Sequence, residues 1–134
     1  MGQDKKKVVC IYSDQSFLKR QKQEMEMKEN ELDHYFFPFL SFTDAYHFLR
    51  QQAEDDRKVH YILIDEKKLE KPTAAFNKLV DLNGLMKDME VIFLTPNGSD
   101  GLRNNIMQYP FVSAYLIKPV PDNYIHFLIE GTAS

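Results

Sequence analysis

The sequence has 134 residues, of which 43% are hydrophobic and 28% charged, and its formal net charge is −3. This length fits one domain and allows a core that needs neither a metal ion nor a disulfide. The slight negative charge argues against a dedicated nucleic-acid-binding domain, which would be basic.

Cysteine usage and hydropathy indicate a cytoplasmic domain without a membrane partner. The single cysteine, Cys10, lies inside an apolar run and cannot form an internal disulfide. No apolar run approaches the roughly 20 residues that span a bilayer, and the N-terminus lacks the apolar stretch of a secretory signal. Residues 1–6 are expected to be frayed.

Five short apolar runs have the length and composition of β-strands. Each is rich in β-branched or aromatic residues, and the unbroken ones suit strands that are covered on both faces of a parallel sheet. Pro38 interrupts the second run, so this strand is expected at a sheet edge, where a missing N–H is tolerated. The runs are Val8–Tyr12, Tyr35–Leu40, Val59–Ile64, Glu90–Leu94 and Ser113–Ile117.

Polar segments with helical spacing separate these runs. In the third of them, Phe76, Leu79, Val80 and Met86 are expected to face inward. Because strand and helix alternate five times, the sequence predicts a single α/β domain over residues 1–134. Its fold class is a doubly wound, flavodoxin-like (βα)5 parallel sheet with strand order 2-1-3-4-5. The helices are expected over Ser16–Glu31, after Thr43 as N-cap, from about Thr73, from near Asp100 and from around Asp122.

Polar residues follow the carboxyl ends of the predicted strands, where open parallel sheets bind ligands. Carboxylates, a hydroxyl and an ammonium at one edge can bind a divalent cation and stabilise a phosphoryl group. Motifs of hydrolases, P-loop proteins and dinucleotide-binding proteins are absent from the sequence, and the chain is not expected to be an enzyme. The residues at the strand ends are Tyr12-Ser13-Asp14, Asp65, Thr95 and Lys118-Pro119.

Four segments that contain these strand-end residues resemble segments of a known protein family. VVCIYSDQSFL, YILID, VIFLT and AYLIKPV follow one another at strand positions and together span nearly the whole chain. In this order they resemble the first, third, fourth and fifth strands of response-regulator receiver domains from two-component systems. VVCIYSDQSFL looks like the first strand, acidic turn and first-helix entry of that family. YILID looks like the strand that ends in the aspartate phosphorylated in the family, and AYLIKPV is similar to the fifth strand with its Lys-Pro pair.

The resemblance implies a role for each of these residues. Asp65 would accept a phosphoryl group from a histidine kinase or phosphotransfer protein, with Mg²⁺ bridging its carboxylate and the phosphoryl oxygens. Lys118 would contact a phosphoryl oxygen, lie within hydrogen-bond reach of Asp65 before modification, and be aimed by Pro119. Thr95 and Tyr115 would form the switch, although Tyr115 could equally be a half-buried strand aromatic. A downstream protein would bind the face of the fourth helix, fifth strand and fifth helix.

The chain departs from the family at the metal site. The family has two adjacent acids after its first strand, whereas this chain offers Ser13-Asp14 in one register and Tyr12-Ser13 in the other. We prefer the first register, with Asp14 as a metal ligand and Ser13 as a weak one, although Asp14 could instead cap the first helix. The backbone carbonyl of Lys67 would be a further ligand, and its ammonium could enter the pocket. We therefore expect weak Mg²⁺ binding, improved by Ser13→Asp or Lys67→Ala.

Three functions are consistent with these residues. The first is a receiver that is phosphorylated on Asp65 and signals through a conformational switch. The second is a pseudo-receiver that binds a partner protein without phosphorylation. The third is a flavodoxin-type small-molecule domain, for which SDQSF after the first strand makes a poor phosphate loop.

Overall fold

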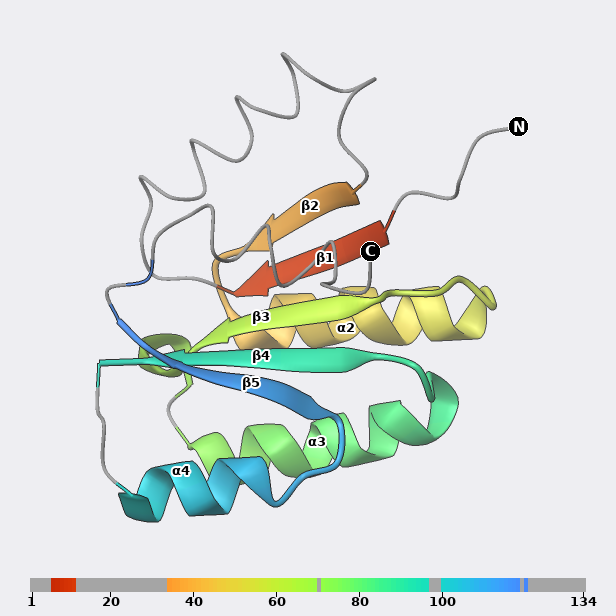
Figure 1. The fold of residues 1–134 in the computed structure, drawn as a ribbon. Helices are drawn as coiled ribbons and strands as arrows, with labels where there is room; N and C mark the ends of the chain where they lie inside the picture. The colour runs from red at the N-terminus through yellow and green to blue at the C-terminus, as the bar shows by residue number, and fades with distance from the viewer. Residues whose placement is uncertain (1–5, 12–33, 70, 97–99, 119, 121–134) are drawn as a thin grey trace, which may run out of the picture.

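The computed structural model describes residues 6–11, 34–69, 71–96, 100–118 and 120 (Figure 1). The helices predicted over 16–31 and from 122 lie outside these ranges. The described strands are β1 (Lys6–Ile11), β2 (His34–Phe39), β3 (Tyr61–Asp65), β4 (Glu90–Thr95) and β5 (Val112–Ile117). The described helices are α2 (Phe42–Glu54), α3 (Pro72–Leu85), α4 (Asp100–Met107) and the short 3-10 helix η1 (Glu66–Lys68).

The five strands form one parallel sheet in the order β2-β1-β3-β4-β5, which confirms the predicted fold class and topology. As expected from its proline, β2 lies at an edge of this sheet, with Pro38 opposite Cys10 of β1. Strand β1 begins at Lys6, one residue inside the segment that was expected to be frayed. The order places the carboxyl ends of β3, β4 and β5 side by side.

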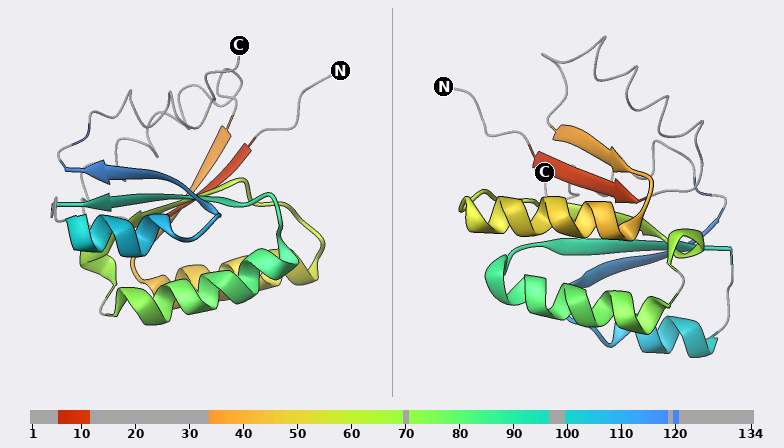
Figure 2. Two further views of the ribbon diagram at one scale, coloured as in Figure 1. Left: turned by 60° about the horizontal axis from the view of Figure 1, so that its bottom comes forward. Right: turned by 180° about the vertical axis from the view of Figure 1, so that it is seen from behind.

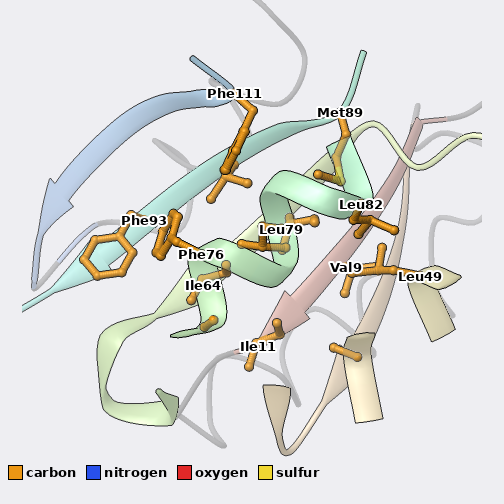
Figure 3. Close-up of a cluster of buried hydrophobic side chains, with 14 of the residues drawn as sticks. Val9, Ile11, Leu49, Ile64, Phe76, Leu79, Leu82, Met89, Phe93 and Phe111 are labelled. Carbon is orange, nitrogen blue, oxygen red and sulfur yellow. The ribbon is translucent and has the colours of Figure 1, made fainter. Parts of the chain in front are cut away.

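The three described α-helices lie on one face of the sheet (Figure 2). Side chains of α3 fill the space between the helices and strands, and Phe76 stacks on Phe111 with ring centroids 6.2 Å apart (Figure 3). Alternate strand residues point into this layer because successive side chains of a strand face opposite ways. The fully buried members include Val9, Ile11, Leu49, Ile62, Ile64, Phe76, Leu79, Leu82, Val91 and Phe93.

The opposite face of the sheet is buried as well. Val8, Cys10, Leu63 and Leu94 are all 0% exposed and form a second apolar cluster with Tyr61 and Ile92. The central strands β1, β3 and β4 therefore carry apolar side chains on both faces. This pattern agrees with the unbroken apolar runs in the sequence, because only strands covered on both sides tolerate them.

Two local predictions were wrong. Helix α2 is capped by Ser41 rather than Thr43, since Ser41 has extended backbone angles and its Oγ accepts the Asp44 N–H at 3.2 Å. Val80 of α3 is 47% exposed, whereas Leu79 is fully buried. One residue turns a helix by about 100°, which rotates Val80 away from the stripe that Leu79 shares with Leu82.

Candidate functional site

Asp65 is a fully buried carboxylate at the carboxyl end of β3, near the middle of the sheet. Its Oδ1 accepts a hydrogen bond from the backbone N–H of Lys67 at 3.0 Å, which also caps η1. Its Oδ2 accepts a hydrogen bond from Nζ of Lys118, and the two side chains form an ion pair. A buried charge is tolerated only with such partners. The expected contact between Lys118 and Asp65 is therefore present.

Lys118 reaches this carboxylate from the end of β5, on the far side of β4. Its backbone N–H donates to the carbonyl oxygen of Thr95 at 2.8 Å, which ties the start of the loop after β5 to the end of β4. The Lys118 side chain is only 16% exposed. Lys118 is therefore anchored to β4 by its backbone and to Asp65 by its ammonium.

Thr95 ends β4 and is fully buried beside the end of β3. Its hydroxyl donates a hydrogen bond to Oε2 of Glu66, which follows Asp65 in the chain. Glu66 was not predicted as a site residue. The sequence feature that points to Glu66 is its position directly after the aspartate at the strand end. Its contact with Thr95, however, depends on side-chain conformation that the sequence does not specify.

Tyr115 lies on β5 and stacks on Phe93 of β4, with ring centroids 5.7 Å apart. Burial raises the pKa of the Tyr115 phenol, and the nearby Glu66 carboxylate raises it further. The Arg103 guanidinium on α4 acts in the opposite direction. Glu66 thus interacts with both residues that were predicted to form the switch, Thr95 by a hydrogen bond and Tyr115 through its charge.

The remaining predicted site residues are placed only in part. Asp14, Ser13 and Pro119 lie outside the described residues. The Lys67 side chain is exposed, so the alternative in which its ammonium fills the pocket is not supported. Within the described ranges, no three His, Cys, Asp or Glu side chains are grouped to hold a metal ion. In the same ranges, no helix is both long and apolar enough to cross a membrane.

The chemistry of the donor set nonetheless fits a hard divalent cation. Asp65 would supply a carboxylate at the edge where ligands of parallel sheets bind, and Lys67 would supply the backbone carbonyl two residues later. Oxygen ligands of these kinds are those that Mg²⁺ uses in proteins, and Mg²⁺ keeps several waters besides them. Asp14 would complete the set if the predicted register of the first turn holds.

Several solved structures with the same fold are response regulators or receiver domains. A response regulator from Thermotoga maritima has a TM-score of 0.69 at 15% identity, over 94% of this chain and 95% of that one. A CheY-like receiver domain protein from Methanospirillum hungatei JF-1 has a TM-score of 0.68 at 17% identity, over 95% and 92%.

A third solved structure with this fold contains a modified aspartate and a metal ion. It is a response regulator from Burkholderia pseudomallei with a phosphorylated aspartic acid, a calcium ion and citrate, and has a TM-score of 0.64 at 16% identity. The match covers 90% of this chain and 64% of that one. No protein-family model matches the sequence, and no curated protein does either. At these identities the likeness establishes a receiver-domain fold.

Proposed function

We propose that this chain is a receiver domain in which Asp65 accepts a phosphoryl group from a histidine kinase or phosphotransfer protein. The observation that carries this proposal is the buried ion pair of Asp65 and Lys118, with the buried Thr95 at the end of the neighbouring strand. A buried ion pair contributes little net stability, because desolvation offsets its attraction. Such a pair at the ligand-binding edge of a parallel sheet is therefore a mark of function.

The transfer exchanges one bond to phosphorus for another. A carboxylate oxygen of Asp65 attacks the phosphorus atom of a phosphohistidine, the new P–O bond forms, and the P–N bond breaks. The imidazole leaves with the electron pair of the P–N bond. It then exchanges protons with solvent until it reaches its equilibrium protonation state. Lys118 is positioned to offset negative charge on the phosphoryl oxygens, and the Thr95 hydroxyl is a hydrogen-bond donor at the same edge. A bound Mg²⁺ would neutralise further charge.

The outgoing signal would pass to a downstream protein across α4 and β5. Met107 of α4 is 41% exposed and Ile117 of β5 is 54% exposed, so both elements present large apolar side chains to solvent. Tyr115 lies on the same strand and is partly buried. The fifth helix, which was predicted to complete this face, lies outside the described residues.

The test is incorporation of phosphate from a small-molecule phosphodonor with Mg²⁺ present. Wild type is expected to be modified slowly, Asp65→Asn not at all, and Ser13→Asp faster because it restores a carboxylate. Since the Lys67 side chain is exposed, Lys67→Ala is expected to change the rate little, against the expectation from sequence. Incorporation that persists in Asp65→Asn would show that another residue is the acceptor.

One observation favours the pseudo-receiver as a second candidate. The Thr95 hydroxyl is bonded to Glu66, an anion that belongs to the chain itself. Such a domain would bind its partner while the residues at the strand ends keep one conformation and are not phosphorylated. Unchanged partner binding in Asp65→Asn, together with no incorporation in wild type at high Mg²⁺, would support this reading.

A further inference from the structure

The Glu66 carboxylate lies at the site but has no role in the proposed phosphoryl transfer. Glu66 follows Asp65 directly, is partly buried, and accepts the hydrogen bond of the Thr95 hydroxyl through Oε2. Thr95 itself is fully buried. The bond is partly buried and joins the residue after Asp65 to the end of β4.

A threonine hydroxyl has a single hydrogen to donate. While Thr95 gives this hydrogen to Glu66, it cannot give it to a phosphoryl oxygen on Asp65. Phosphorylation must either break the Glu66–Thr95 bond or proceed without Thr95 as a donor. Hydrogen bonds to an ionised acceptor are roughly twice as strong as neutral ones, so the bond is a substantial barrier.

We infer that Glu66 takes, within the chain, the hydrogen-bonding position that a phosphoryl group on Asp65 would use, and so restrains phosphorylation. This inference rests on the proposed function. The backbone keeps Glu66 next to Asp65, so its negative charge also opposes the arrival of an anionic phosphoryl group. Glu66 is thus an internal competitor, and removing it should make the site more receptive.

Tyr115 is also affected by the Glu66 charge. The Glu66 carboxylate adds to the effect of burial in raising the pKa of the Tyr115 phenol, so its field extends to β5. Both residues of the predicted switch therefore interact with the same carboxylate. The Thr95 hydroxyl can donate to a phosphoryl group only after its bond to Glu66 breaks.

The experiment measures binding of beryllofluoride in Mg²⁺, followed by the amide NMR signal of Thr95. Glu66→Gln removes the charge but keeps an amide oxygen that can accept from Thr95, whereas Glu66→Ala removes both. Affinity is expected to rise about tenfold in Glu66→Ala, as for loss of one competing charge-assisted hydrogen bond, and less in Glu66→Gln. Glu54→Gln, an exposed acid at the C-terminus of α2, is the matched control and is expected to match wild type.

A Thr95→Ala background separates the hydrogen bond from the charge. If competition runs through the hydroxyl, Glu66→Ala gains much less affinity in that background. Equal affinity of wild type and Glu66→Ala would overturn the inference and leave the proposed function standing. If neither wild type nor any Glu66 variant binds beryllofluoride or incorporates phosphate while folded, the proposed function fails, and the inference fails with it.

Discussion

Lys118 is the partner on which the buried charge of Asp65 depends. Removing it leaves a carboxylate with 0% exposure and without its ammonium, and breaking a buried ion pair in this way is strongly destabilising. We expect Lys118→Met to lower the free energy of unfolding by about 3 kcal/mol at pH 7, measured by urea denaturation.

The double variant Lys118→Met/Asp65→Asn provides the control for this effect. It is expected to recover most of the loss, because the amide of asparagine carries no charge to desolvate. Asp65→Asn alone should cost less than Lys118→Met, since the flexible lysine stem can carry its ammonium to water. A Lys118→Met variant as stable as wild type would mean that the Asp65 charge is solvated.

Cys10 is expected to lower the free energy of unfolding at alkaline pH. Burial raises the pKa of its thiol far above the ordinary value, so the folded protein keeps the proton that the unfolded chain loses above about pH 8.5. The folded state then binds more protons, and the free energy of unfolding falls as pH rises through that value. One such group costs about 2 kcal/mol between pH 7 and pH 10.

Cys10→Ala isolates this contribution, because it removes the thiol and leaves every other titratable side chain in the protein. The fall in unfolding free energy from pH 7 to pH 10 is expected to be smaller in the variant by that amount. Native Cys10 should also resist thiol reagents at neutral pH, as a fully buried thiol does. Identical pH profiles for the two proteins would show that the thiol ionises equally easily in the folded state.

At the scale of single elements, the N-cap of α2 can be tested by comparing Ser41 with Thr43, a nearby residue that also carries a hydroxyl. Ser41 Oγ accepts the Asp44 N–H, whereas Thr43 is an exposed residue within the first turn. Ser41→Ala is expected to lower the free energy of unfolding by about 1 kcal/mol, and Thr43→Ala by a few tenths at most. The reverse order in denaturant midpoints would restore Thr43 as the cap.

The sequence predicts most elements because their signals are local. Runs such as Glu90–Leu94 are apolar and β-branched over a strand's length, and the observed β4 extends this range by only one residue. The cap of α2 was misplaced because Ser41 and Thr43 carry the same kind of hydroxyl, and backbone angles alone distinguish them. Val80 was misplaced because neighbouring apolar residues blur the edge of a helical stripe.

At the scale of the whole molecule, topology explains which part of the site could be predicted. Asp65, Thr95 and Lys118 end three adjacent parallel strands, and the strand order alone brings them to one edge. Glu66 enters the site through its side-chain conformation across β3 and β4, for which neither spacing nor hydropathy gives a signal. The fold thus explains why the three strand-end residues meet, while the contact made by Glu66 depends on one side-chain conformation.

The two apolar clusters should unfold as one unit, because β1, β3 and β4 contribute side chains to both. Leu79 lies in the cluster under the helices and Leu63 in the opposite one, and both are 0% exposed. Leu79→Ala and Leu63→Ala are each expected to lower the free energy of unfolding by about 2–5 kcal/mol. Val80→Ala, at a position 47% exposed, should cost about 0.5 kcal/mol or less.

Urea denaturation followed by tyrosine fluorescence and by far-ultraviolet circular dichroism tests this cooperativity. Both signals should give a single transition with the same midpoint in wild type and in each leucine variant, as two-state unfolding requires. A leucine variant whose two midpoints separate would show that the faces of the sheet melt independently. A negligible cost for Leu63→Ala would instead show that the second face is not closely packed, since a cavity destabilises only where the surrounding atoms cannot collapse into it.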